Sequence, residues 1–193
     1  MDDSATYTAP LADKEDSALI VVDIQDKFLA PIANAERVTK RSRFLIEIAN
    51  LFSIPILVTE QYPSRMGGTN AEILEVLPPG TVRHDKLCFS SCGIESFQEE
   101  WAKAEKTQAI VVGIETHICV NQTVHDFLAN EIDVFVCADA VGARTTEAHD
   151  IAIARMRQAG AVVTHTESVA YEWLKSADAD EFKSALEIVK RYS

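Results

Sequence analysis

Short apolar runs recur along this chain, and segments with helical patterning separate them. The runs are rich in Val, Ile and Ala and lack the alternation expected of a strand with one exposed face. Near-continuous apolar strands of this kind are typical of a parallel sheet that is covered on both faces. We expect six strands, at 18–22, 54–59, 81–84, 108–112, 133–137 and 161–164.

Apolar residues at helical spacing fill the intervening segments. We expect helices at 36–52, 94–104, 117–130 and 146–158, and two more around 169–174 and 178–191. Alternating strands and helices predict an α/β fold with right-handed crossovers. The predicted architecture is a three-layer sandwich with helices on both faces of a six-stranded parallel sheet in the order 3-2-1-4-5-6. At 193 residues the chain suits one domain, which we place at 18–193 after a polar N-terminal arm at 1–17.

The charge balance narrows the expected partners. The formal net charge is −12, from 18 basic and 30 acidic residues, and no basic stripe offsets it. Nucleic acid and anionic membrane surfaces are therefore not expected partners. No apolar run approaches the roughly 18 residues that a membrane span needs, and residues 1–17 lack the layout of a secretion signal. We expect a cytoplasmic protein.

The cysteines and glycines give little sign of a metal or a cofactor. Cys88, Cys92, Cys119 and Cys137 lack the paired spacing of a zinc site, and the five histidines are scattered. No glycine-rich phosphate loop is present, so we expect no dinucleotide. A reducing cytoplasm suits four free thiols, although the spacing of Cys88 and Cys92 also permits a disulfide. Cys137 ends an apolar run and is expected in the core.

Cys119 lies where an expected strand passes into an expected helix. The apolar run stops at Gly113, a short turn follows, and Thr116 is placed to cap the helix. Cys119 would then lie in the first helical turn, where free N–H groups favour a thiolate. A free cysteine is more often a small buried apolar residue. The strand–turn–helix context nevertheless makes Cys119 a candidate nucleophile.

The predicted strand order brings a carboxylate to this cysteine. Ligands of open α/β sheets bind at the carboxyl ends of the strands, where the strand order reverses. The first strand ends at Asp23, and its neighbour, the fourth strand, leads into the Cys119 turn. Asp23 is therefore a candidate base, and a turn or helix-capping role remains the alternative.

Three motifs in order carry a resemblance to a known family. They are Val21-Val22-Asp23-Ile24-Gln25, Asp85-Lys86 followed by Phe89-Ser90, and Gly113 to Val120 with its central Glu115-Thr116-His117-Ile118-Cys119. With them, the chain resembles the isochorismatase-like cysteine hydrolases over about residues 18–169. It is most similar to a metal-less subgroup of uncertain substrate. Ala138-Asp139-Ala140-Val141 also fits the family.

The resemblance implies a catalytic triad of Asp23, Lys86 and Cys119. Asp23 would take the thiol proton, Lys86 would help keep the thiolate, and Cys119 would form a thioester acyl-enzyme. A cis peptide between Ile114 and Glu115 would aim the amides of Glu115 and Cys119 at the oxyanion. The implied reaction is hydrolysis of a C–N bond in a small amide or ureido compound. Topology does not bring Lys86 to the site, so its role rests on the resemblance alone.

The chain departs from the family's nicotinamidases, whose metal site includes histidines after the second strand. Residues 60–67 hold no histidine, so the expected site contains no metal and no cofactor. We take Gln25, Phe28, Gln61, Tyr62 and Phe89 as candidate substrate contacts. The alternatives are a turn before Pro63 for Gln61 and Tyr62, core packing for the two phenylalanines, and backbone hydrogen bonding for Gln25.

Two further expectations concern assembly and function. The resemblance implies a homo-oligomer: a dimer, a tetramer or a larger ring. The alternative function is a low-turnover redox, stress-responsive or scaffold protein on the same fold, in which Cys88, Cys92 and Cys119 form reversible oxidation products. Cleavage of the vinyl ether of isochorismate does not need a thiol, so Cys119 favours carbonyl chemistry.

Overall fold

The computed structural model of the protein describes residues 10–193. Its centre is a six-stranded sheet in the order β3-β2-β1-β4-β5-β6, in which all neighbouring strands are parallel. The predicted fold class and strand order are confirmed. The strands are β1 (Ser17–Val22), β2 (Ile56–Gln61), β3 (Arg83–Lys86), β4 (Gln108–Ile114), β5 (Asp133–Gly142) and β6 (Val162–Thr164).

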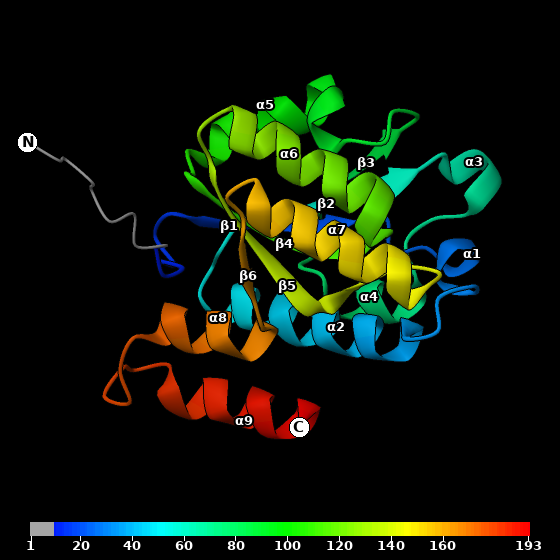
Figure 1. The fold of residues 1–193 in the computed structure, drawn as a ribbon. Coiled ribbons are helices and arrows are strands. Elements are labelled where there is room, and N and C mark those ends of the chain that lie inside the picture. The colour runs from blue at the N-terminus through cyan, green and yellow to red at the C-terminus, as the bar shows by residue number, and fades with distance from the viewer. Residues whose placement is uncertain (1–9) are drawn as a thin grey trace, which may run out of the picture.

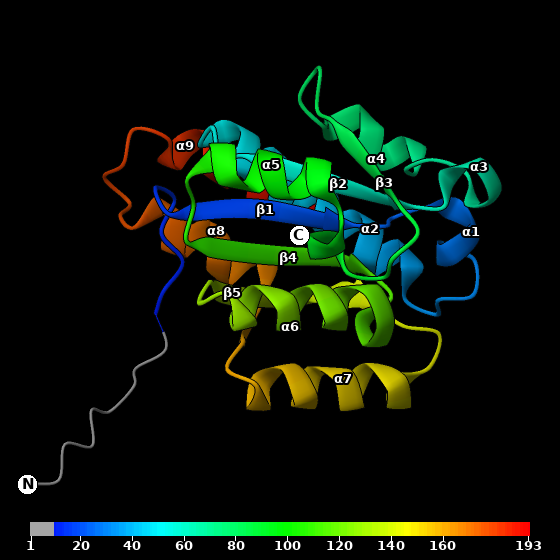
Figure 2. The same ribbon diagram turned by 90° about the horizontal axis from the view of Figure 1, so that it is seen from above.

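Helices cover both faces of the sheet, which makes the three predicted layers (Figures 1 and 2). One face carries α2 (Ala35–Leu51), α8 (Thr166–Leu174) and α9 (Phe182–Tyr192), and the other carries α5 (Glu95–Ala104), α6 (Asn121–Ala129) and α7 (Thr146–Gln158). Because side chains of a strand alternate between faces, β1 serves both cores. Leu19 and Val21 join the α2 core, and Ile20 and Val22 join the α6 core.

Four short elements were not predicted. They are α1 (Asp26–Leu29), α3 (Pro63–Met66), α4 (Ala71–Val76) and the 3₁₀ turn η1 (Ser91–Gly93). Each is too short to show helical periodicity in the sequence. Three of them follow the carboxyl ends of β1, β2 and β3, so they frame the edge of the sheet where ligands bind in folds of this kind.

Two strand ends differ from the prediction in ways that affect the site. β3 covers Arg83–Lys86 instead of 81–84, which makes Lys86 its last residue. β5 continues past Cys137 to Gly142, because a register shift between Val111 and Gly113 lets it pair again with the end of β4. Both differences lengthen the ordered backbone at the carboxyl edge.

Gly113 lets β4 approach β1 closely at this edge. Its φ is +125°, and a Cβ built on it would lie 2.1 Å from the carbonyl oxygen of Val22. No L side chain fits there, because real Cβ atoms do not approach backbone oxygen so closely. The ends of β1 and β4 can therefore lie side by side, one residue before Asp23.

The predicted N-terminal arm falls in two parts. Residues 1–9 lie outside the described residues, and the segment just before β1 packs on its own chain. The amide of Ala12 donates to Glu172 of α8, and the amide of Asp13 donates to the side chain of Gln108 on β4. Among the described helices, none combines the length and the apolar character that crossing a membrane would demand.

Candidate active site

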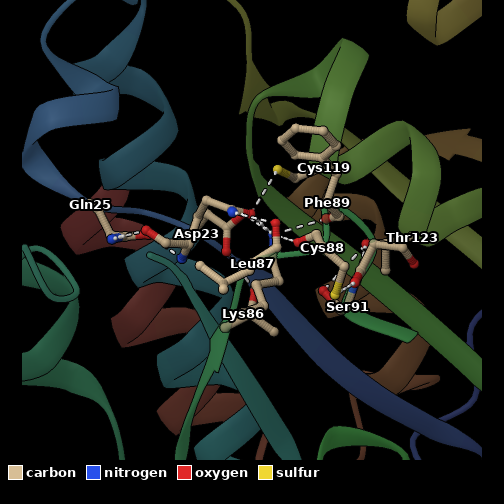
Figure 3. A network of polar contacts seen from close by, with 12 residues as sticks. Asp23, Gln25, Lys86, Leu87, Cys88, Phe89, Ser91, Cys119 and Thr123 are labelled. Atoms are coloured by element: carbon tan, nitrogen blue, oxygen red, sulfur yellow. Dashed lines mark hydrogen bonds and ion pairs between the residues drawn. The ribbon is translucent and has the colours of Figure 1, made fainter. Parts of the chain in front are cut away.

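Asp23 and Lys86 form a buried ion pair at the carboxyl edge of the sheet (Figure 3). Asp23 Oδ2 lies 2.6 Å from Lys86 Nζ. Asp23 follows β1 in the left-handed region, with a φ of 52°, while Lys86 ends β3. Since β2 lies between these strands, the Lys86 side chain crosses the end of β2 to reach the carboxylate. The strand order alone did not predict this contact, because it depends on the length of the lysine side chain.

The ion pair is held by further hydrogen bonds from both sides. Lys86 Nζ donates to Gln61 Oε1 at 2.7 Å and to the carbonyl oxygen of Phe89 at 2.9 Å. Thr59 Oγ1 donates to Asp23 Oδ1 at 2.8 Å. Thr59 was missed by the sequence reasoning. Its place two residues before Gln61, on the same face of β2, is the signal that could have found it.

Cys119 lies in a π-helical turn, η2 (Thr116–Val120), between β4 and α6. The Ile114–Glu115 peptide bond is cis, as predicted. The predicted cap is wrong. Thr116 lies within the turn, and its hydroxyl bonds to Nδ1 of His149 at 3.1 Å instead of capping the helix. The wider turn replaces the regular helix start that the cap required, but it still places Cys119 at the beginning of the helical segment.

The thiol of Cys119 lies beside both charged groups, and its surroundings oppose its ionisation. Burial, and then the Asp23 carboxylate, raise the pKa of Cys119 to about 12, against the opposing effect of Lys86. Both effects act against the thiolate that the turn was expected to favour. Burial also raises the pKa of Asp23 above its ordinary value, although Lys86 opposes the change. A carboxylate with a raised pKa is a stronger base, and it is the group next to the thiol.

A cavity of about 90 Å³ opens over Cys119. Its lining is mostly apolar. Two of the apolar lining residues, Ile114 and Ile118, were not among the predicted substrate contacts. The cavity is lined by Asp23, Phe28, Gln61, Phe89, Ile114, Glu115, Ile118 and Cys119. The structure therefore brings Phe28, Gln61 and Phe89 to the thiol, and the space fits a small apolar group.

Gln25 and Tyr62 do not line this cavity. Gln25 uses its side chain on the backbone, donating to the carbonyl oxygens of Gln61 and Gly67 and accepting from the amide of Gln61. Tyr62 is 37% exposed at the start of the turn into α3. The alternatives that the sequence left open, a backbone role for Gln25 and a turn at Tyr62, match these positions.

The remaining cysteines lie apart from the cavity lining, and all four are free thiols. Cys137 is buried in the core, as predicted, and Cys88 is exposed. His84 and His165 make structural contacts, with Glu100 and with the amide of Glu167. Within residues 10–193, no group of three or more His, Cys, Asp or Glu side chains is arranged to hold a metal ion.

Comparison with known proteins places this arrangement in a family. The model of the isochorismatase domain matches residues 17–168. The chain belongs to the isochorismatase family. This isochorismatase-family chain is 36% identical to isochorismatase family protein 1B of Dictyostelium discoideum over 180 residues, which is 92% of the chain and 87% of the relative.

Solved structures repeat the fold of this isochorismatase-family protein. A structure of MAR1 ribonuclease from Caenorhabditis elegans has a TM-score of 0.89 and 35% identity, over 94% of this chain and 93% of that one. YcaC from Pseudomonas aeruginosa, whose structure holds hexane-2,5-diol and covalent acrylamide, has a TM-score of 0.88 and 26% identity, over 97% and 96% of the two chains. These names describe the neighbours, and a hydrolase is the activity that the family suggests for this chain.

Proposed function

We propose that the protein hydrolyses a C–N bond of a small amide or ureido compound, with Cys119 as nucleophile. The observation that carries this proposal is the convergence of the Cys119 thiol, the Asp23–Lys86 ion pair and a small apolar cavity at one edge of the sheet. A thiol near neutral pH needs a base before it can attack a carbonyl carbon. Asp23 is the base and Lys86 is the fixed positive charge that holds it.

The acylation half of the reaction follows from these positions. The thiol proton passes to Asp23, and the electron pair left on sulfur forms a C–S bond to the carbonyl carbon. The amides of Glu115 and Cys119 are the proposed donors to the oxyanion, and such donors are worth about 10²–10³ in rate each. The C–N bond breaks as its nitrogen takes the proton from Asp23, which leaves a thioester on Cys119.

Hydrolysis of the thioester restores the site. Asp23 takes a proton from water, the hydroxide forms a C–O bond to the carbonyl carbon, and the C–S bond breaks. Sulfur recovers the proton as the carboxylic acid, or the carbamic acid from a ureido substrate, leaves. Over the full cycle one water is consumed and one amine or ammonia is released, so no metal or redox partner is needed to balance the reaction.

The size and lining of the cavity limit the substrate. A space of about 90 Å³ holds only a few non-hydrogen atoms, and Phe28, Phe89 and Ile118 give it apolar walls. We infer that the acyl group is short, uncharged and apolar. Covalent acrylamide in the YcaC structure is consistent with this class, since acrylamide is a small primary amide that also alkylates thiols.

The name of the Caenorhabditis elegans neighbour raises a second substrate class, RNA. RNA binding depends on cationic side chains that meet the phosphates. This chain has a net charge of −12, and the ammonium of its site is buried in an ion pair. We therefore place small amides ahead of RNA, and single-stranded RNA becomes one arm of the test.

The test compares the protein with Cys119→Ser and Asp23→Asn variants on a panel of short aliphatic amides and ureido acids, isochorismate and single-stranded RNA. Ammonia or amine release that both variants abolish supports the proposal. A thioester mass on the Cys119 peptide, trapped by acid quench, would add the intermediate. Cleavage of isochorismate or RNA that survives Cys119→Ser, without amide hydrolysis, would overturn it.

A further inference from the structure

One oxygen atom of Gln61 lies against two side chains of the proposed triad. Gln61 Oε1 is 2.7 Å from Lys86 Nζ and 3.8 Å from Cys119 Sγ, within hydrogen-bonding range for sulfur. The other end of the amide is tied down, because Nε2 donates to the carbonyl oxygen of Leu87 at 3.1 Å. This bond fixes which end of the amide faces the lysine and the thiol. Figure 3 shows Lys86 and Cys119 in the same polar network.

The sheet holds Gln61 rigidly in that place. Gln61 is the last residue of β2 and pairs in register with Lys86 of β3. The backbone N–H of Gln61 donates to Gln25 Oε1, and its backbone carbonyl oxygen accepts from Gln25 Nε2. Thr59, on the same face of β2, hydrogen-bonds to Asp23, as Gln61 does to Lys86. β2, which lies between β3 and β1, therefore supports both members of the ion pair that spans it.

The chemistry of an amide oxygen gives this contact a direction. A carbonyl oxygen accepts hydrogen bonds and cannot donate one. It can therefore accept the thiol hydrogen of Cys119, but it has only repulsion to offer a thiolate. The lysine is equally constrained, since Asp23, Gln61 and the carbonyl oxygen of Phe89 take its three short hydrogen bonds. Removing the Gln61 oxygen would free one ammonium hydrogen beside the sulfur.

We propose that Gln61 is a positioning residue, whose side-chain oxygen holds the thiol hydrogen on Cys119 in the resting protein and holds the Lys86 ammonium against Asp23. The proposal rests on the hydrolase function proposed above. Attack then requires the S–H group to turn from Gln61 to Asp23, where the S–H bond breaks and an O–H bond forms. Gln61 thus acts on the thiol beside burial and the Asp23 carboxylate, which raise the pKa of Cys119.

Other charged groups near the thiol come from three elements. Asp23 follows β1, Lys86 ends β3, and Glu115 lies in the cavity wall before η2. Glu115 is paired with Arg144 at 2.8 Å, so its charge is balanced outside the cavity. A Gln61 variant leaves Asp23 and Glu115 unchanged and alters only the hydrogen bonding of Lys86, which the proposal includes. A change in the behaviour of the thiol can therefore be assigned to the Gln61 side-chain oxygen and its two contacts.

The test uses two Gln61 variants with opposite expected signs. Gln61→Met keeps the length of the side chain and removes the oxygen, so at pH 8 iodoacetamide should alkylate Cys119 at least about threefold faster, as a fall of half a pKa unit requires. Gln61→Glu places a negative charge at the sulfur and should slow alkylation by at least about threefold on the same scale. The readout is the rate for the Cys119 peptide by mass spectrometry across pH 6–10. Both variants should lower kcat on any amide that the wild type hydrolyses.

Gln25→Met is the matched control, since it loosens the backbone of Gln61 without touching the thiol or the lysine. A purely structural role predicts that all three variants change Cys119 labelling in the same direction, and that result would overturn the proposal. Equal labelling in wild type and both Gln61 variants, each folded by circular dichroism, would overturn it too. Because labelling needs no substrate, a clear pair of opposite shifts without amide hydrolysis would refute the proposed function and leave the role of Gln61 standing.

Discussion

The hydroxyl of Thr59 donates a 2.8 Å hydrogen bond to Oδ1 of Asp23, while Lys86 binds the other carboxylate oxygen. The two oxygens are thus held from two strands. A carboxylate fixed in this way can present only a defined edge to the thiol. The orientation of the proposed base is therefore a property of β2 and β3 as much as of β1, which carries it.

We expect Thr59→Val to lower kcat/KM about tenfold, because a hydrogen bond to a charged group contributes about 1.5–3 kcal/mol. The change removes the hydroxyl and keeps the branched shape of a buried strand residue. Steady-state kinetics on the amide found in the panel measure the effect. Thr39→Val, a buried threonine on α2, is the control and should leave kcat/KM unchanged. A Thr59→Val enzyme with wild-type kinetics would mean that Asp23 needs no orienting partner.

Lys86→Met should destabilise the protein by about 3–5 kcal/mol near pH 8, since it leaves the Asp23 carboxylate buried and unpaired. Burial already raises the pKa of Asp23, and loss of the ammonium raises that pKa further. A group with a raised pKa in the folded state favours folding at low pH, and that contribution is lost as the pH rises through the folded pKa. The deficit should therefore be smaller at pH 5 than at pH 8.

Urea unfolding of wild type and Lys86→Met at the two pH values measures this difference. The double variant Asp23→Asn/Lys86→Met removes both charges and should recover most of the lost stability at pH 8. A deficit that is the same at both pH values would show that packing of the lysine side chain, and not its charge, is what the single variant lost.

Cysteine alkylation should rank the thiols by access. Cys88 is exposed, Cys119 faces the cavity and Cys137 is fully buried. We expect iodoacetamide to label Cys88 first, Cys119 next and Cys137 last. Because the pKa of Cys119 is raised to about 12, its labelling rate should climb through pH 10 without a plateau. Cys137 labelling as fast as Cys119 would contradict the open cavity, and a plateau near pH 7 would contradict the neutral thiol.

Gly113→Ala should destabilise the fold by about 3 kcal/mol or prevent folding, because the added Cβ meets the backbone of Val22 at 2.1 Å. Gly80→Ala is the control, because it separates the cost of a positive φ from the cost of a steric clash. Gly80 has a φ of +85° with open space around its Cβ position, so its substitution should cost only about 1 kcal/mol for the backbone conformation. Thermal unfolding of both variants compares them directly. Equal costs would mean that the β1–β4 contact tolerates a methyl group.

The sequence predicted the fold because its strongest signals are local. Apolar runs such as 108–112 mark buried strands, and the helices between them are long enough to show their period. The bounds of the short elements around the site were beyond such reasoning, because α1 and α3 have four residues each. The predicted bounds of β3 were displaced by two residues, because the strand lies at the edge of the sheet and includes no apolar residue that would mark it.

The site was predictable where two neighbouring strands end, and less so elsewhere. Asp23 and Cys119 follow from the order of β1 and β4. Lys86 reaches the site across β2, and only the family resemblance pointed to it. The role of Gln61 depends on which end of an amide faces inward, and the contact with Leu87 that decides it is set by the fold. The Thr116 cap failed because a π-helical turn replaced the regular helix start.

The lysine of this site belongs to the edge strand β3, which has only four residues and a neighbour on one side. An edge strand has unpaired backbone groups along one side, and segments with few contacts open locally at a lower free energy than the core. Release of β3 would withdraw the ammonium from Asp23 while β1, β4 and the cysteine turn stay folded. The proposed nucleophile and its cation thus depend on different parts of the sheet. A molecule in which only β3 has opened would keep Cys119 in place but would lack the Lys86 ammonium beside Asp23. We therefore expect loss of activity to precede loss of the fold as the protein is warmed.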